Sequence, residues 1–357
     1  MKINVAILSV ILLCASCSVE DDIIKKEELS MRPDSEKQSN LNNGTANAPT
    51  ENRFTANSTV EDIISDPAFA DFGYLLFPVD RYVSGSMTLA QISSSSVYVW
   101  YSHIRTDKTV EIINRLYNDA AAGNRIFYQI YSDAEIAADP SKADTGLFLF
   151  RGEVGKPFAI TNAGGGFMYV GAMHDSFPHS LEISNAGYNA FALIYRPDDP
   201  YTDLARAISF VHDNAAELGV KPEDYSLWGG SAGARMAATL GNSAYLYQLT
   251  GRTDIPQAAT VIMQYTGYSS ASQYDAPTYV CVGSNDGIAS WQTMQSRLQR
   301  LSAMGIPTEF HVYDGLGHGF GLGEGTVAEG WVNYALKFWQ KNMTVDGNTG
   351  IPPVYAD

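Results

Sequence analysis

The chain has 357 residues, of which 39 are acidic and 23 basic, so its net charge at neutral pH is −16. This length allows one large α/β domain plus an N-terminal extension, and the apolar content of 45% predicts a full hydrophobic core. The acidic balance argues against nucleic-acid binding, because proteins that bind nucleic acids present a basic face.

The first residues carry the features of an export signal. Lys2 supplies a positive start, and residues 3–13 form an apolar run that is too short to cross a bilayer as a helix. The run ends at Cys14-Ala15-Ser16-Cys17, which resembles a bacterial lipoprotein signal cut before a cysteine. The resemblance implies a signal over 1–17, lipid on Cys17 and anchoring in a bacterial outer membrane, and the acidic residues 20–22 resemble a surface-export tag. A plain signal peptide is the alternative.

The rest of the chain divides by composition. Residues 18–60 are polar and poor in aliphatics, so they are predicted to be a disordered tether. Residues 61–345 are predicted to form a single domain, followed by a C-terminal tail over 346–357. Within that domain, 61–131 is expected to form either the first antiparallel strands of a sheet or a cap over the site. Cys281 is expected to be a buried core residue.

Beyond residue 131 strands and helices alternate. Apolar runs predict strands at 146–150, 157–161, 190–195, 226–228, 260–264, 278–282 and 309–313, with a further strand at 126–131. Stripes at helical spacing lie between most of them, such as the one from Leu204 to Leu218. Strands that alternate with single helices predict a doubly wound, mostly parallel sheet flanked by helices.

One stretch between a predicted strand and a predicted helix carries the pattern of a nucleophile. Residues 229–233 read Gly-Gly-Ser-Ala-Gly, the Gly-x-Ser-x-Gly pattern of a nucleophile elbow centred on Ser231. A serine on a sharp strand-to-helix turn needs neighbours without side chains, because its own backbone is strained and closely packed. The following helix also directs its N-terminal N–H groups at the reacting oxygen.

A second loop offers donors for a developing oxyanion. Residues 162–167, Asn-Ala-Gly-Gly-Gly-Phe, follow the predicted strand 157–161. Three successive glycines let bare N–H groups approach a charged oxygen, as acyl transfer requires. A flexible loop without function is the alternative.

Two further loops offer an acid and a base. Asp286 follows the predicted strand 278–282; it is the candidate acid, with helix capping as the alternative role and Asp275 or Asp314 as substitutes. His318, the candidate base, lies among glycines after the last strand. The glycines predict an exposed loop of adaptable shape, which a histidine that transfers protons requires. His174 and His179 follow the glycine triplet and are candidates to line the pocket. A metal site at these two histidines lacks a third ligand at useful spacing, and no metal or other cofactor is expected.

The order Ser231, Asp286, His318 is the order that α/β-hydrolases use. From about 147 to 340 the chain resembles the esterase and lipase branch of the α/β-hydrolase fold, and more narrowly the hormone-sensitive-lipase-like and bacterial acetyl- or feruloyl-esterase groups. Their glycine loop reads His-Gly-Gly-Gly, whereas here Ala163 replaces the histidine. The resemblance implies oxyanion donors on the backbone of three residues, namely Gly165, Gly166 and Ala232. Tyr195-Arg196 resembles the Tyr-Arg pair that ends the next strand in this group.

These features predict a serine esterase that forms an acyl-enzyme on Ser231. The resemblance and the export signal together favour small-acyl esters, of acetyl or feruloyl type, in small molecules or glycans outside the cytoplasm. The membrane is expected to be a partner only through the lipid anchor. Two alternatives stay open: a serine peptidase of the same fold, and a catalytically inactive, surface-anchored binding protein.

Overall fold

The computed structural model describes residues 52–77 and 83–344. They contain one eight-stranded sheet with the order β1-β2-β4-β3-β5-β6-β7-β8. The pairs β1–β2 and β2–β4 are antiparallel and all the others are parallel, so the prediction of a mostly parallel sheet is confirmed. The strands are β1 (Phe127–Tyr128), β2 (Gly146–Phe150), β3 (Pro157–Asn162), β4 (Asn189–Ile194), β5 (Lys221–Gly230), β6 (Thr260–Gln264), β7 (Thr278–Gly283) and β8 (Thr308–Tyr313).

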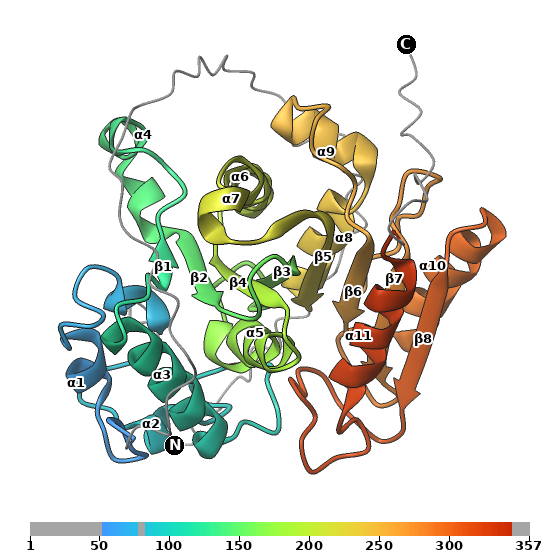
Figure 1. The fold of residues 1–357 in the computed structure, drawn as a ribbon. Helices are drawn as coiled ribbons and strands as arrows, with labels where there is room; N and C mark the ends of the chain where they lie inside the picture. The colour runs from blue at the N-terminus through green and yellow to red at the C-terminus, as the bar shows by residue number, and fades with distance from the viewer. Residues whose placement is uncertain (1–51, 78–82, 345–357) are drawn as a thin grey trace, which may run out of the picture. The chain divides into compact units, whose positions relative to one another are not determined.

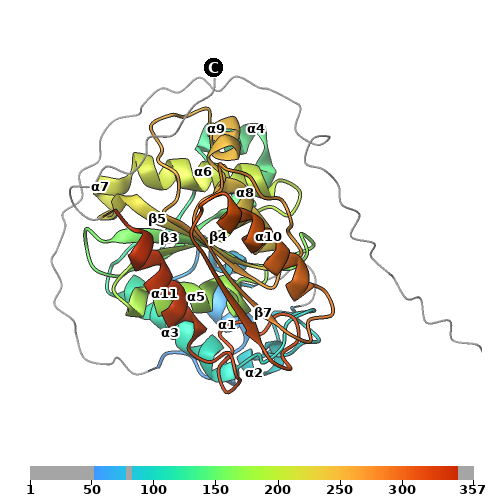
Figure 2. The same ribbon diagram turned by 90° about the vertical axis from the view of Figure 1, so that its right-hand side faces the viewer.

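Helices cover both faces of the sheet (Figures 1 and 2). On one face α5 packs against β3 and β4, and α11 against β6 and β7; on the other, α8 packs against β5 and β6, and α10 against β7 and β8. The helices are α1 (Val60–Ile64), α2 (Leu89–Ile92), α3 (Thr106–Ala121), α4 (Asp133–Ala138), α5 (Ser176–Asn185), α6 (Pro200–Asp213), α7 (Ala215–Leu218), α8 (Ala232–Leu240), α9 (Ser243–Thr250), α10 (Trp291–Ala303) and α11 (Trp331–Asn342), with 3₁₀ turns η2 (Gly73–Leu76), η3 (Pro140–Asp144) and η4 (Ala172–His174).

The central strands are mostly apolar because the sheet is covered on both faces. Every residue of β2, β3, β4, β6 and β7 is buried. Cys281 lies in β7 as a free, fully buried thiol, as predicted. At the edge, β8 is only partly buried, and β1 has two residues where the sequence predicted six.

Two predicted elements have different limits in the structure. The stripe from Leu204 to Leu218 is divided at Asn214 between α6 and α7, and the Asn214 amide donates to the carbonyl of Phe210 as the first helix ends. β5 is ten residues long rather than three, because it begins at Lys221 and continues to Gly230, the glycine that precedes Ser231.

The folded unit begins before residue 61. Phe54 is 3% exposed, and its backbone N–H and carbonyl both bind the Asn114 side chain, at 2.9 and 2.8 Å. Arg53 pairs with Asp66 at 3.2 Å. The predicted tether over 18–60 is therefore wrong for 53–60, because an aromatic residue and a shared amide give these residues a docking site. The remainder of the tether, the signal over 1–17 and the tail over 346–357 lie outside the described residues.

The regular elements described within 61–131 are mainly helices, and the region adds little to the sheet. It supplies α1, η2, α2 and α3, which lie together beside the β1 end of the sheet in Figure 1, and then the short β1. α3 contacts both α5 and η4. The sequence predicted either early antiparallel strands or a cap in this region. Only Phe127–Tyr128 form such a strand. The helices α1, α2 and α3 form a layer against the body of the domain.

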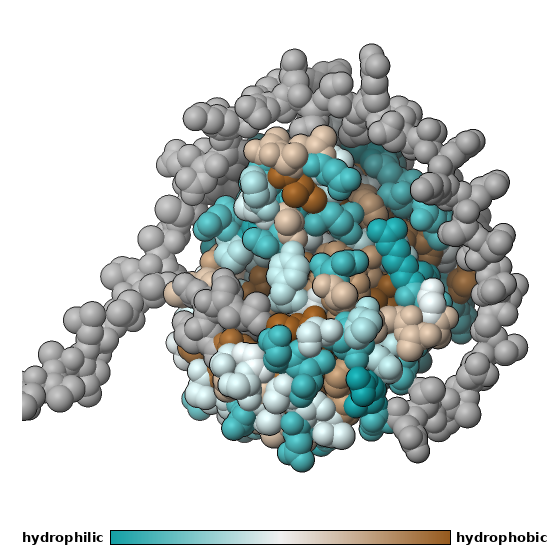
Figure 3. Space-filling model, turned by 90° about the vertical axis from the view of Figure 1, so that its left-hand side faces the viewer, coloured by the Kyte–Doolittle hydropathy of each residue, from teal (hydrophilic) through white to brown (hydrophobic). Residues whose placement is uncertain are grey.

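The side of the molecule that carries β1 and α1 faces the viewer in Figure 3, where polar residues prevail and apolar residues are exposed in patches between them. Within 52–77 and 83–344, no helix has the length and apolar character needed to cross a membrane.

The docking of the N-terminal segment can be tested at Asn114. Asn114→Ala leaves the N–H and carbonyl of Phe54 without partners, so the free energy of unfolding should fall by about 1–3 kcal/mol in urea titrations. Asn118→Ala, one helical turn further along α3, should change it by less than about 0.5 kcal/mol. Equal effects of the two substitutions would show that Asn114 does not hold this segment.

Candidate active site

Ser231 lies at the sharp turn between β5 and α8. Its φ of 51° and ψ of −115° are a strained backbone conformation for a residue with a side chain. The flanking glycines permit the turn: a Cβ on Gly229 would collide with the backbone of Gly233, and a Cβ on Gly233 with the carbonyl of Asn162. This is the strand-turn-helix context that the Gly-x-Ser-x-Gly pattern requires.

The structure brings Ser231, His318 and Asp286 into one hydrogen-bonded chain. His318 Nε2 lies 3.0 Å from Ser231 Oγ, and His318 Nδ1 lies 2.8 Å from Asp286 Oδ2. The Asp286 side chain is fully buried and that of His318 is 8% exposed. Such an arrangement fixes the imidazole tautomer with the proton on Nδ1, which leaves Nε2 free to accept the serine proton.

Asp286 makes the contacts of both roles that the sequence allowed. One carboxylate oxygen contacts His318, while the other accepts hydrogen bonds from the N–H groups of Ile288 and Ala289, at 2.8 and 2.7 Å. The second role caps the turn before α10 and not the helix itself, because α10 begins at Trp291 and its N-cap is Ser290.

The substitute acids are engaged elsewhere. Asp275 is buried against Asn242 and lies 3.5 Å from Arg297, which gives it a structural role. Asp314 accepts a hydrogen bond from Ser284 at 3.0 Å. Among the described residues, neither aspartate has a contact with His318.

The glycine triplet lies directly beside the nucleophile. A Cβ on Gly164 would come within 2.9 Å of the Ser231 Cβ, and Gly165, with a φ of 124°, has no room for a Cβ beside the Tyr169 carbonyl. The Gly164 N–H donates to Asp175 at 2.6 Å. By contrast, the N–H groups of Gly165, Gly166 and Ala232 donate to no other group within the described part of the chain. None of the three is thus committed to another acceptor, as their predicted role of oxyanion donors requires.

Solved structures share this architecture. An acetyl ester-xyloside bifunctional hydrolase from Caldicellulosiruptor lactoaceticus aligns over 60% of this chain and 95% of its own, with a TM-score of 0.53 and 20% identity. A thermophilic esterase from Thermogutta terrifontis, with propionate bound, aligns over 57% and 92%, with a TM-score of 0.50 and 20% identity. The chain has the α/β-hydrolase fold. No functionally curated protein matches the sequence significantly.

A family model named BD-FAE matches residues 152–291, less than half of the chain. The matched stretch contains the glycine triplet, Ser231 and Asp286, and it ends before the loop of His318. It therefore covers the part of the α/β-hydrolase fold from β3 to the start of α10.

The loop of His318 is held by a segment far away in the sequence. Ser102 Oγ donates to the His318 carbonyl and the Ser102 N–H to the Gly319 carbonyl, each at 2.9 Å. Gln264, at the end of β6, donates to the Gly321 carbonyl at 2.9 Å. Ser102 could not be found from the sequence, because it belongs to no motif and lies 216 residues from its partner.

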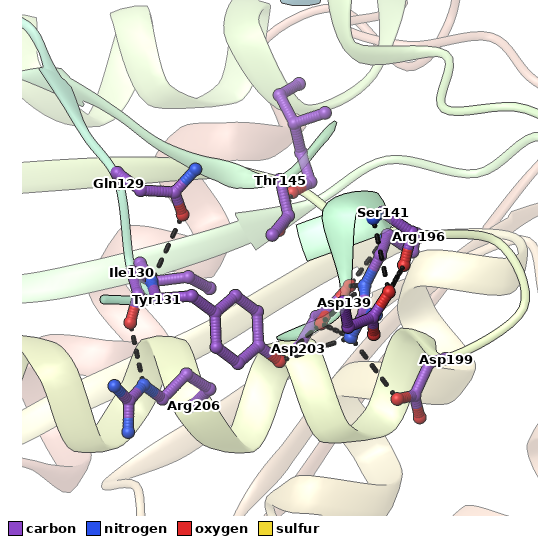
Figure 4. A network of polar contacts seen from close by, with 11 residues as sticks. Gln129, Ile130, Tyr131, Asp139, Ser141, Thr145, Arg196, Asp199, Asp203 and Arg206 are labelled. Atoms are coloured by element: carbon purple, nitrogen blue, oxygen red, sulfur yellow. Dashed lines mark hydrogen bonds and ion pairs between the residues drawn. The ribbon is translucent and has the colours of Figure 1, made fainter. Parts of the chain in front are cut away.

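Ala163, which stands in place of the family's loop histidine, is anchored through its backbone. The Tyr195 hydroxyl donates to the Ala163 carbonyl at 2.8 Å. Arg196 points elsewhere and binds the buried Asp203 at 2.6 Å, and Asp203 also accepts from the Tyr131 hydroxyl at 2.6 Å (Figure 4). The Tyr-Arg pair therefore ties the glycine loop to β4 and ties the segment around Tyr131 to α6.

The two histidines after the glycine triplet are both buried. Burial lowers the pKa of His174 and of His179 to about 3, so both are neutral at pH 7. His174 packs edge-on against Tyr98, with ring centroids 4.2 Å apart, and His179 packs against Trp331. In 52–77 and 83–344 no three His, Cys, Asp or Glu side chains are grouped so as to hold a metal ion.

Buried His174 should make the domain acid-sensitive. In the unfolded chain histidine takes up its proton near pH 6.5, whereas in the folded chain His174 stays neutral down to about pH 3. The histidine therefore favours unfolding increasingly as the pH falls from 6.5 toward 3, with a slope of up to about 1.4 kcal/mol per pH unit.

In urea titrations between pH 7 and pH 4, His174→Phe should reduce this slope by the contribution of one histidine, up to about 1.4 kcal/mol per pH unit, and leave the equal contribution of His179. His103→Phe, at an exposed histidine, should leave the whole slope in place. Parallel pH profiles for the wild type and His174→Phe would contradict a neutral, buried His174.

Proposed function

We propose that the protein is a serine hydrolase that cleaves carboxylic esters through an acyl-enzyme on Ser231. The observation that carries this proposal is the chain of contacts from Ser231 through His318 to Asp286, at 3.0 and 2.8 Å, beside N–H groups for which the described residues offer no acceptor. Nucleophile, base, orienting acid and oxyanion donors are the four components that acyl transfer needs.

Each group has a defined role in this reaction. His318 Nε2 takes the proton from Ser231 Oγ as the oxygen attacks the ester carbonyl, and Asp286 stabilises the imidazolium that forms. The negative charge on the carbonyl oxygen is met by the N–H groups of Gly165, Gly166 and Ala232. His318 then returns its proton to the leaving alcohol. Water, deprotonated by the same histidine, hydrolyses the acyl-enzyme and releases the acid.

The substrates that we propose are small-acyl esters, of acetyl or feruloyl type, in small molecules or glycans. The support comes from outside the chain's own pocket: one structural neighbour is described as an acetyl ester-xyloside hydrolase, and the other was solved with propionate. An inactive binding protein fits less well, because the hydrogen-bonded chain from Ser231 to Asp286 is intact.

The proposed mechanism is tested at its orienting acid. Asp286→Asn should lower kcat for a chromogenic acetyl ester by up to about 10⁴, because the imidazole then adopts the wrong tautomer. Asp314→Asn, a matched change on a neighbouring loop, should stay near wild type. Ser231→Ala should lose both activity and labelling by a fluorophosphonate probe.

The combined substitution separates a coupled triad from independent effects. Asp286→Asn together with His318→Ala should be little worse than the more damaging of the two alone, because triad members act as a unit. Losses that simply multiply, or labelling that persists in Ser231→Ala, would place the nucleophile or its base elsewhere.

We also propose that the protein is exported and anchored through lipid on Cys17, and that its site faces esters outside the cytoplasm. Cys17→Ala should move the protein from the membrane fraction to the soluble fraction with its activity unchanged, whereas Cys14→Ala should stay membrane-bound. Fractionation and detergent partition measure the difference. A Cys17→Ala protein that remains with the membrane would contradict lipid attachment at this residue.

A further inference from the structure

One buried carboxylate close to the site has no role in the mechanism above. Asp175 lies between η4 and α5, and its side chain is inaccessible to solvent. Its Oδ2 accepts hydrogen bonds from the Gly164 N–H, at 2.6 Å, and from the Tyr101 hydroxyl, at 3.0 Å. Its Oδ1 accepts from the Tyr265 hydroxyl at 3.1 Å. No motif pointed to this aspartate.

The three donors come from three separate parts of the active site. Gly164 opens the glycine triplet, Tyr265 follows β6, and Tyr101 directly precedes Ser102, which holds the His318 loop. The Tyr265 ring also packs against the His318 ring, with centroids 4.9 Å apart. The carboxylate is thus the common acceptor of segments that carry the oxyanion donors and the base.

The backbone beside the nucleophile is shaped to admit this carboxylate. A Cβ on Gly230, the residue before Ser231, would collide with both carboxylate oxygens of Asp175. Asp175 therefore lies in van der Waals contact with the nucleophile turn while it binds the glycine loop. Asp175 is thus placed between the glycine loop and the nucleophile turn, and the separation of these two segments defines the oxyanion site.

Burying a carboxylate here is unfavourable in itself. Burial raises the pKa of Asp175 to about 6, against the opposing effect of its three hydrogen-bond donors. No Lys or Arg of the described residues pairs with it; His179 lies 3.9 Å away and is neutral at pH 7, because burial lowers its pKa to about 3. A residue that costs stability in this way is more readily explained by the geometry that it imposes than by stabilisation of the fold.

We propose that Asp175 is the positioning residue of the oxyanion loop. By binding the Gly164 N–H, it fixes the start of the triplet so that the next two N–H groups, those of Gly165 and Gly166, are presented to the oxygen at Ser231. Gly164 is then a structural donor and not an oxyanion donor. This inference rests on the proposed esterase function, and its test includes a readout that does not depend on catalysis.

Two substitutions separate hydrogen bonding from charge. Asparagine keeps the shape: its carbonyl oxygen can accept from Gly164 and Tyr101, and its NH₂ can donate to the Tyr265 hydroxyl, which is both donor and acceptor. Alanine loses all three contacts. Since both variants lack the carboxylate charge, the difference between Asp175→Asn and Asp175→Ala reports the hydrogen bonds and the volume of the side chain, without a change in charge.

The first readout is the rate of hydrolysis of a chromogenic acetyl ester. The rate is divided by the concentration of active sites, which is titrated with a fluorophosphonate. Asp175→Ala should lower kcat by about 10²-fold, the range seen when one oxyanion contact is lost, with KM changed by less than about threefold. Binding of an alkylboronic acid, whose serine adduct is tetrahedral, should weaken in proportion to kcat. Asp175→Asn should retain at least about a third of wild-type kcat in the same assay.

The matched control is Asp224→Ala. Asp224 is also a buried aspartate, bound to Thr344 and Lys221, but it precedes Gly230 by six residues of β5, roughly 20 Å along the strand. Its replacement should lower the melting temperature while kcat per titrated site stays at the wild-type value. A purely structural Asp175 would behave in the same way as this control.

Amide hydrogen exchange over residues 160–168 gives the readout that does not need an ester. Exchange should become faster in Asp175→Ala and stay near wild type in Asp175→Asn and Asp224→Ala. If the protein proves inactive on esters but exchange is still faster in Asp175→Ala, the proposed function is rejected, whereas the role of Asp175 in holding the glycine loop is supported. Three results would each overturn the assignment of Asp175 as the positioning residue. They are unchanged exchange in Asp175→Ala, a wild-type kcat per titrated site in Asp175→Ala, and an equal loss of kcat in Asp175→Asn and Asp175→Ala.

Discussion

The active site depends on the closeness of three backbone segments: the glycine loop after β3, the turn after β5 and the start of α8. Ser231 can hold a φ of 51° there because Gly233 lies against the carbonyl of Asn162 and Gly229 against the backbone of Gly233. A side chain at either glycine would push these segments apart. The same approach brings Gly164 next to Ser231, so the strain of the turn and the position of the glycine loop have one cause.

The N-terminal helical layer is part of the active site as well as of the fold. Phe54 is docked through Asn114 of α3, and the chain then passes from α2 to Tyr101 and Ser102, which bind Asp175 and the backbone of His318. Gly319 is equally constrained, because a Cβ on it would collide with the carbonyl of Trp100. The layer therefore gives the loop of the base a second support, in addition to the strand β8 that precedes it.

Buried polar groups around the site divide into two kinds. The Asp286 side chain is fully buried, but each of its oxygens has a defined partner, with His318 on one side and two N–H groups on the other. His174 and His179 are neutral, and no described residue bonds to their buried Nε2 atoms. The first kind holds the imidazole of His318, whereas the second makes the domain sensitive to acid.

Beyond residue 131 the sequence by itself determined the order of the strands and the three loops that carry Ser231, Asp286 and His318, because periodicity and glycine spacing are local properties. It also indicated the mostly parallel sheet, since single helices alternate with strands. Only the tertiary structure decided that Asp286 and not Asp275 or Asp314 meets the histidine, and that residues 53–60 belong to the fold. The partners Tyr101–Asp175 and Ser102–His318 are 74 and 216 residues apart, so no local pattern records them.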